Sequence, residues 1–257
     1  VYEGMTFDKA PCATPIPAAG TDDQVMNDTI AAMRKLNIYG VVSGEPEMVA
    51  HWRTAEPARI MAAVDYRLPG TAGQRHVGAR TLDELRRLHK QGRLTMIGEI
   101  MAQYEGVRPD DPRLDPLWAL AEELDVPVAI HMGPGEPDQP YAEGGYRAAL
   151  GDPLLLEPVL LRHPRLRISV MHAGYPMGAN MRAIMFSYPQ VYVDIGSIVY
   201  TEPRPAFYAY LRELVDAGYG DRILFGSDQM IWPGVIEPSV RAIDEALEAG
   251  GIAEARG

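Results

Sequence analysis

The chain of 257 residues has a formal net charge of −11, which argues against nucleic acid and anionic membranes as partners, because both attract clustered lysine and arginine. Its length is sufficient for the core of one large α/β domain. The single cysteine, Cys12, excludes an internal disulfide, and we assign it no catalytic role. No apolar run approaches the roughly 18 residues that a membrane-spanning helix needs. None of these properties identifies a cellular compartment.

Short apolar runs of strand length alternate with helical patterns along the chain. The predicted strands are rich in Val and Ile and mostly apolar on both faces, which is typical of strands covered by helices. In chain order, we expect a loop over 1–21, a helix over 22–37, a strand over 38–43, a helix over 46–55, a strand over 59–66, a helix over 81–91, a strand over 94–100, a helix over 115–125, a strand over 127–132, a helix over 152–163, a strand over 167–172, a helix over 177–187, a strand over 191–197, a helix over 205–217, a strand over 222–227 and a helix over 237–249.

This regular alternation indicates parallel strands joined by crossover helices. Seven predicted strands and eight predicted helices, beginning with a helix, indicate a (β/α)8 TIM barrel that lacks its first strand in this chain. The competing architecture is an open doubly wound sheet, which would be expected to carry a G-x-G-x-x-G turn after an early strand. No such turn is present. We therefore expect a single barrel domain over 1–257, with 1–21 as the loop before its first helix.

Ionisable side chains fall at the ends of several predicted strands. Each of five residues lies at or near the C-terminal end of a different strand, where a barrel carries its active site: Glu99, His131, His172, Asp194 and Asp228. Neutral imidazole and carboxylate groups are suitable ligands for a divalent metal. Any one of these residues alone is as easily a hydrogen-bonded group at a strand end, but His131, His172 and Asp228 together indicate a functional site.

For the other candidates the alternatives stay open. Glu99 could be a metal ligand, a proton shuttle or the structural partner of an arginine, and Asp194 is interpreted as structural. Tyr175 and Trp232, in the loops after His172 and Asp228, are either walls of a substrate pocket or ordinary loop anchors. The remaining histidines are expected at the solvated surface: His51, His76, His89 and His163.

Three segments resemble the metal-dependent amidohydrolase superfamily, and more closely its amidohydrolase-2 branch of TIM-barrel hydrolases and decarboxylases: PVAIHMGPG (127–135), VMHAGYP (170–176) and LFGSDQMIWP (224–233). The resemblance runs from about residue 22 to the end of the chain. It implies that His131 binds the metal, and that His172 binds a second metal or assists the water or substrate as an acid–base. It also implies that Asp228 binds the metal and takes a proton from its water. The GEI sequence around Glu99 is similar to TatD-like hydrolases, which implies a further ligand there.

One motif of the family is missing. The family's first strand ends in His-x-His, which supplies two metal ligands, and this motif does not occur in residues 1–257. The segment VYEGMTF (1–7) is a further strand candidate, but it contains no histidine. Either the first strand lies upstream of Val1, or the site has lost half of its ligands. The strand count and the absence of an initiator Met favour the first explanation.

The resemblance implies a metal-dependent hydrolase that acts on an amide, lactone or ester bond of a small molecule. The cofactor expected is zinc, with manganese or magnesium as alternatives, and Asp228 accepts the proton of the activated water while His172 polarises the substrate carbonyl or orients the water. One alternative is non-oxidative decarboxylation of an aromatic or unsaturated carboxylic acid at the same site. The other is a non-catalytic or metal-free barrel whose metal site has decayed. The acidic surface favours a neutral substrate, and assembly as a homodimer is left open.

Overall fold

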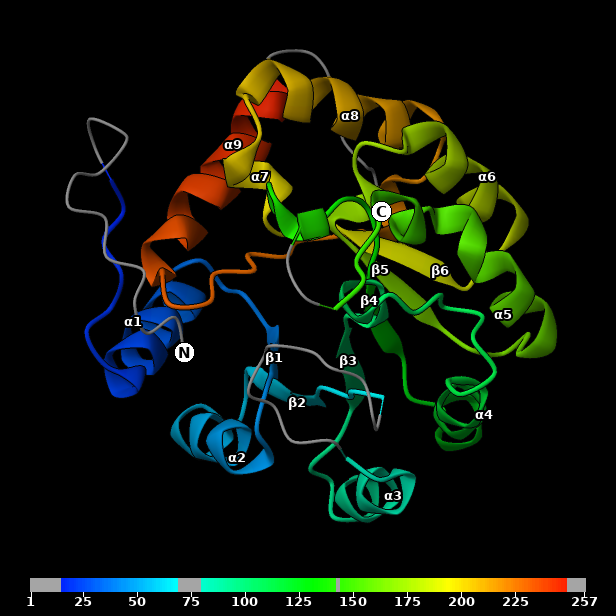
Figure 1. Ribbon diagram of the computed structural model, residues 1–257. Helices are drawn as coiled ribbons and strands as arrows, with labels where there is room; N and C mark the ends of the chain where they lie inside the picture. The colour runs from blue at the N-terminus through cyan, green and yellow to red at the C-terminus, as the bar shows by residue number, and fades with distance from the viewer. Residues whose placement is uncertain (1–14, 69–79, 142–143, 249–257) are drawn as a thin grey trace.

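A parallel sheet runs through the centre of the molecule. The computed structural model describes residues 15–68, 80–141 and 144–248, so the strand candidate at 1–7, Cys12 and His76 lie outside the described residues. Within these ranges seven strands pair in chain order, each parallel to the next. They are β1 (Gly40–Ser43), β2 (Ile60–Val64), β3 (Met96–Ile100), β4 (Val128–His131), β5 (Ile168–Met171), β6 (Val191–Asp194) and β7 (Ile223–Leu224). The sheet curls, and the helices lie around its outer side (Figure 1).

The helices begin where the sequence supplies capping groups. The side chains of Thr21 and Thr81 accept hydrogen bonds from backbone N–H groups in the first turns of α1 and α3, which satisfies donors that a helix start leaves unpaired. The helices are α1 (Asp22–Lys35), α2 (Pro46–Ala55), α3 (Leu82–Lys90), α4 (Asp115–Leu124), α5 (Glu157–Arg162), α6 (Gly178–Ser187), α7 (Ile198–Thr201), α8 (Arg204–Asp216) and α9 (Ile236–Glu248). None of the helices in the described ranges is long and apolar enough to cross a membrane.

The predicted helix over 152–163 differs from the observed structure. It consists of a 3-10 turn, η4 (Pro153–Leu156), that leads into the short helix α5. Pro158 has no N–H to donate to the preceding turn, which interrupts the α-helical hydrogen-bond pattern at this position. The position of this helix was therefore predicted correctly, but its first part is a 3-10 turn and not an α-helix.

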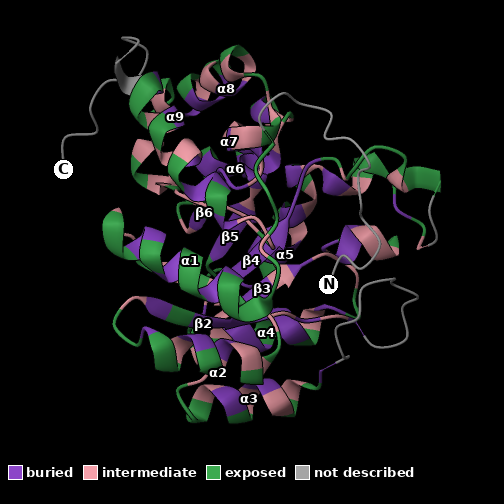
Figure 2. Ribbon diagram, turned by 90° about the vertical axis from the view of Figure 1, so that its left-hand side faces the viewer, coloured by how far each residue is buried: buried purple, intermediate pink, exposed green. Residues whose placement is uncertain are grey.

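The core lies between the sheet and the helices. Val64, Val128, Val170 and Val193, from four strands of the sheet, are completely buried. They share one face of the sheet by strand register and belong to the same apolar cluster as Phe207 of α8. In Figure 2 the buried residues accordingly line the inner sides of the helices and the strands.

The opposite face of the sheet points toward the barrel axis, and its side chains are partly exposed to solvent at the two edges of the sheet. Val41 of β1 and Met61 of β2 are 44% and 45% exposed, and Tyr192 of β6 and Leu224 of β7 are 37% and 44% exposed. By strand register these side chains point to the same side as His131. A strand between β7 and β1 would close the barrel over them. The described sheet is thus a curled TIM-type half-barrel with one strand position open, which confirms the predicted fold class.

Candidate active site

The carboxyl ends of three neighbouring strands bring three ionisable side chains together. Glu99 lies near the end of β3, His131 is the last residue of β4, and His172 follows β5 directly. One oxygen or nitrogen atom from each of these residues lies within 4.8 Å of the corresponding atoms of the other two. The meeting occurs because parallel neighbouring strands end at the same edge of the sheet. These residues are called the Glu-His-His cluster below.

Glu99 reaches this cluster through a local irregularity in β3. The register with β4 shifts between Ile97 and Ile100, and Gly98 has a φ of 147°. A Cβ atom at Gly98 would lie 2.6 Å from the carbonyl oxygen of Ala129 and 2.7 Å from its Cβ. Only glycine therefore allows β3 to approach β4 this closely immediately before Glu99.

His172 is held from the neighbouring strand end of β6. Its Nδ1 donates to the carbonyl oxygen of Gly196 at 2.8 Å, which leaves Nε2 to face Glu99, whose Oε1 is 3.8 Å away. The carboxylate of Asp194 accepts hydrogen bonds from the backbone N–H of Gly196 at 2.9 Å and of His172 at 3.4 Å. This structural use of Asp194 agrees with its interpretation from the sequence.

The charges around His172 favour its protonated form. Burial lowers the pKa of the imidazole, but the nearby carboxylate of Glu99, together with the charges of Asp228 and Asp194, outweighs burial and raises this pKa to about 9. Burial in turn raises the pKa of the Asp194 carboxyl, although the charge of His172 opposes this effect. In the protein without metal, His172 is therefore a cation at neutral pH that balances the carboxylates beside it.

His131 is held by two residues that the sequence analysis did not identify. The side-chain amide nitrogen of Gln103 lies 2.7 Å from its Nδ1, and the hydroxyl of Tyr104 lies 3.3 Å from its Nε2. Both belong to η1 (Ala102–Glu105), the 3-10 turn that follows β3. The only signal in the sequence was the position of these polar residues directly after the strand that carries Glu99.

Asp228 lies beside the Glu-His-His cluster rather than within it. A Cβ placed on Gly196 would come within 3.2 Å of the Asp228 Cβ, so the aspartate is next to the residue that orients His172, and its charge acts on that imidazole. Its backbone has a φ of 46°, and its carbonyl oxygen accepts a hydrogen bond from Tyr200 at 2.8 Å. The roles of Asp228 and of the cluster residues remain predictions at this point.

Tyr175 and Trp232 lie in the loops after β5 and β7, where the sequence places them. The half-buried ring of Tyr175 packs edge-on against Tyr210 with 5.0 Å between centroids, and burial and a hydrogen bond with Glu202 raise the pKa of its hydroxyl. Trp232 is half-buried, and its backbone N–H donates to Gln229. Tyr175 is therefore anchored in the loop; whether either ring also contacts a substrate stays a prediction.

Three of the four histidines expected at the surface lie within the described residues, and one of these three is buried. His51 is exposed and His89 is partly buried, but His163 is only 7% exposed, so its expected place at the solvated surface is wrong. Its two ring nitrogens face Asp115 and Glu122 of α4 at 3.2 Å and 3.6 Å. These carboxylates satisfy the polar atoms of the ring, which allows it to be buried without a catalytic role.

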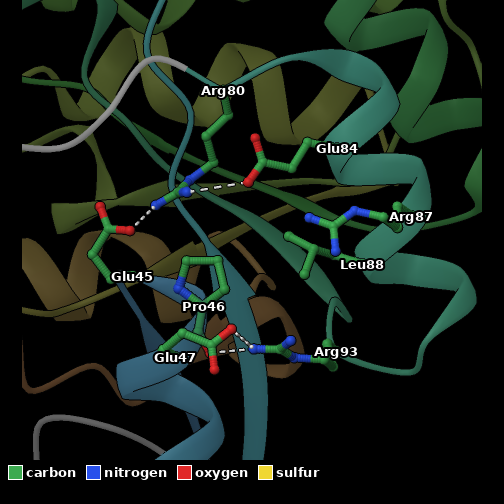
Figure 3. Close-up of a pocket in the computed structure, with 8 residues that line it drawn as sticks. All are labelled: Glu45, Pro46, Glu47, Arg80, Glu84, Arg87, Leu88 and Arg93. Atoms are coloured by element: carbon green, nitrogen blue, oxygen red, sulfur yellow. Dashed lines mark hydrogen bonds and ion pairs between the residues drawn. The ribbon is translucent and has the colours of Figure 1, made fainter.

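A polar hollow of about 190 Å³ lies apart from the cluster, between α2 and α3 (Figure 3). Two of its guanidinium groups pair with its carboxylates: Arg80 contacts Glu45 at 2.9 Å and Glu84 at 3.7 Å, and Arg93 contacts Glu47 at 2.7 Å. Arg80 is 6% exposed and also contacts Asp65 at the end of β2. The charged side chains around the hollow form a network that joins the end of β2 to α2 and α3.

The Glu-His-His cluster is suited to a divalent metal. One carboxylate oxygen and two imidazole nitrogens from separate strands are within reach of a single ion, and this mixed oxygen and nitrogen donor set suits zinc as well as other first-row cations. The tautomer of His172 also fits, because Nδ1 carries the proton and Nε2 has its lone pair available once the ring is neutral.

Known structures share this fold. An uncharacterized TIM-barrel protein from Bordetella bronchiseptica has a TM-score of 0.65 and 18% identity over 90% of this chain and 81% of that chain. A probable 2-pyrone-4,6-dicarboxylic acid hydrolase from Acinetobacter baumannii has a TM-score of 0.61 and 14% identity, over 94% and 86% of the two chains. The 5-carboxyvanillate decarboxylase of Novosphingobium aromaticivorans, whose structure contains bound manganese, has a TM-score of 0.53 and 14% identity, over 91% and 69%.

Sequence comparison identifies the family. Protein fluG of Emericella nidulans is 25% identical over 122 residues, which are 48% of this chain and only 13% of fluG. A family model described as Amidohydrolase matches residues 3–251. Because this match covers nearly the whole sequence, the chain belongs to the amidohydrolase family, in its amidohydrolase-2 branch.

Proposed function

We propose that the chain is a metal-dependent hydrolase that cleaves an amide, lactone or ester bond of a small molecule. The observation that carries this proposal is the Glu-His-His cluster at the carboxyl ends of three neighbouring barrel strands, in a chain that belongs to the amidohydrolase family. Glu99, His131 and His172 would hold the cation, with zinc favoured over manganese and magnesium. When bound, such a cation lowers the pKa of water and polarises a substrate carbonyl.

In this proposal Asp228 is the general base. It lies next to Gly196, outside the group of residues that would hold the cation, which leaves its carboxylate to accept a proton from the attacking water and to transfer that proton to the leaving group. His172, for which the resemblance implies either a second metal or acid–base work, would here be a ligand beside Glu99 and His131. Tyr175 and Trp232 would form walls of the substrate pocket, and the net charge of −11 favours a neutral substrate over an anion.

The test combines metal content with activity. Plasma mass spectrometry of the purified protein should find about one or two equivalents of metal, and the His131→Ala variant should lose them. The Asp228→Asn variant should keep its metal and lose roughly 10²- to 10⁴-fold in kcat on whichever amide, lactone or ester the parent cleaves. His51→Ala, the same kind of change at an exposed histidine of α2, is the control and should match the parent in both measurements.

The other outcomes separate the alternatives. Metal retention combined with carbon dioxide release from an aromatic acid, and no hydrolysis, would replace the proposal by a decarboxylase. Hydrolysis of a lactone without metal would indicate a metal-free enzyme of the same fold. A protein with neither metal nor turnover would be a non-catalytic barrel.

A further inference from the structure

The two histidines of the cluster are held by hydrogen bonds of opposite polarity. Nδ1 of His172 faces the carbonyl oxygen of Gly196, which can only accept, so this nitrogen carries a proton. Nδ1 of His131 faces the side-chain amide nitrogen of Gln103, which can only donate, so this nitrogen is an acceptor. In the neutral rings, the proton therefore lies on Nδ1 of His172 but on Nε2 of His131.

The fold holds the Gln103 amide in this orientation. Gln103 is 2% exposed, and the nitrogen that faces His131 also donates to the carbonyl oxygen of Gly133 at 3.0 Å. Its Oε1 is buried and finds no hydrogen-bond partner in the part of the chain that the structure describes. A buried acceptor without a partner destabilises the folded state, so this arrangement is kept although it lowers stability.

The direction of this hydrogen bond determines whether His131 can act as a ligand. The amide of Gln103 occupies the lone pair of Nδ1, and Nε2 carries the proton toward Tyr104, so neither nitrogen offers a lone pair to a cation. Rotation of the amide by half a turn would place Oε1 against Nδ1, move the proton to that atom and make the Nε2 lone pair available. The same rotation breaks the bond to Gly133 and turns two oxygens toward each other, so it is opposed by the fold.

We infer that Gln103 is a positioning residue that holds His131 in the tautomer unsuited to metal binding, and that metal binding is coupled to rotation of this amide. The inference rests on the proposed function, because it concerns the metal of the same site. A carboxylate in place of the amide would accept from Nδ1 of His131 in either orientation, and such partners strengthen imidazole ligands. Glutamine at this position therefore weakens metal binding relative to glutamate.

Two measurements test the inference. In metal-free protein labelled with 15N-histidine, at a pH where the ring is neutral, ring nitrogen shifts should show His131 with its proton on Nε2, assigned through the His131→Asn variant. In Gln103→Glu the proton should move to Nδ1, and the zinc Kd from competition with a chromophoric chelator should fall about tenfold or more. Gln91→Glu, the same exchange at the exposed end of α3, should leave both the tautomer and the Kd unchanged.

Each contrary result has a distinct meaning. A parent protein with the His131 proton on Nδ1 would overturn the inference without any variant, so the test does not depend on the folding of Gln103→Glu. Tighter zinc binding by Gln103→Glu with an unchanged tautomer would be an effect of the added charge and would also overturn it. An unchanged zinc Kd in Gln103→Glu would also overturn the inference. The proposed function would survive that result as long as the parent binds zinc. A parent that binds no zinc overturns the proposed function and the coupling to metal together.

Discussion

The pKa of His172 makes the stability of the metal-free protein depend on pH. This pKa is raised from 6.5 to about 9 in the folded chain, so between these values the folded state retains a proton that the unfolded state has released. The free energy of unfolding must then fall as the pH rises through this window. The difference between the two pKa values corresponds to about 3 kcal/mol, which is fully present below pH 6.5 and lost above pH 9.

Urea unfolding of the chelator-treated protein, repeated from below pH 6.5 to above pH 9, measures this effect. The difference in unfolding free energy between the parent and His172→Gln should shrink by about 3 kcal/mol across the range. Glu99→Gln should remove much of the same dependence, because the Glu99 carboxylate lies 3.8 Å from the His172 ring and its charge raises the pKa of His172. His51→Gln is the control, and its curve should run parallel to that of the parent. Parallel curves for His172→Gln and the parent would refute the reasoning.

Three further substitutions have expected outcomes. Gly98→Ala should lower both the zinc affinity and the free energy of unfolding, because the new Cβ meets the β4 backbone. The loss of unfolding free energy should be about 1–3 kcal/mol. Gly92 has open space around it, so Gly92→Ala is the control and should leave zinc affinity unchanged. Arg80→Met should lower the urea-derived unfolding free energy by about 2 kcal/mol, because it leaves the largely buried carboxylate of Asp65 without its guanidinium partner. Equal stability would show that this ion pair contributes nothing. Tyr210→Phe should cost about 1–2 kcal/mol by the same assay, since its hydroxyl donates to the buried carbonyl of Ala173, and an unchanged midpoint would argue against that bond.

The site shows how far reasoning from single residues extends. Glu99, His131 and His172 could be found because each lies at a strand end, and the edge of a parallel sheet collects such ends. Gln103 and Tyr104 were not predicted, because a polar residue in a loop can have many roles. Only the approach of η1 to β4 brings these two side chains into contact with His131. His163 was misplaced for a related reason: its burial depends on Asp115 and Glu122, which lie some 40 residues earlier in the chain.

The sequence by itself determined the order and approximate bounds of the strands and helices, the barrel class and the strand-end position of the ionisable residues. These properties follow from apolar periodicity, caps and chain order, all of which are local or topological. Only the tertiary structure decided which atoms meet. Three features depend on how strands and loops distant in sequence pack together: the close approach of β3 to β4 at Gly98, the opposite polarity of the bonds to the two imidazoles and the position of Asp228 outside the cluster. No pattern along one strand encodes that packing, because it is set by neighbours distant in the chain.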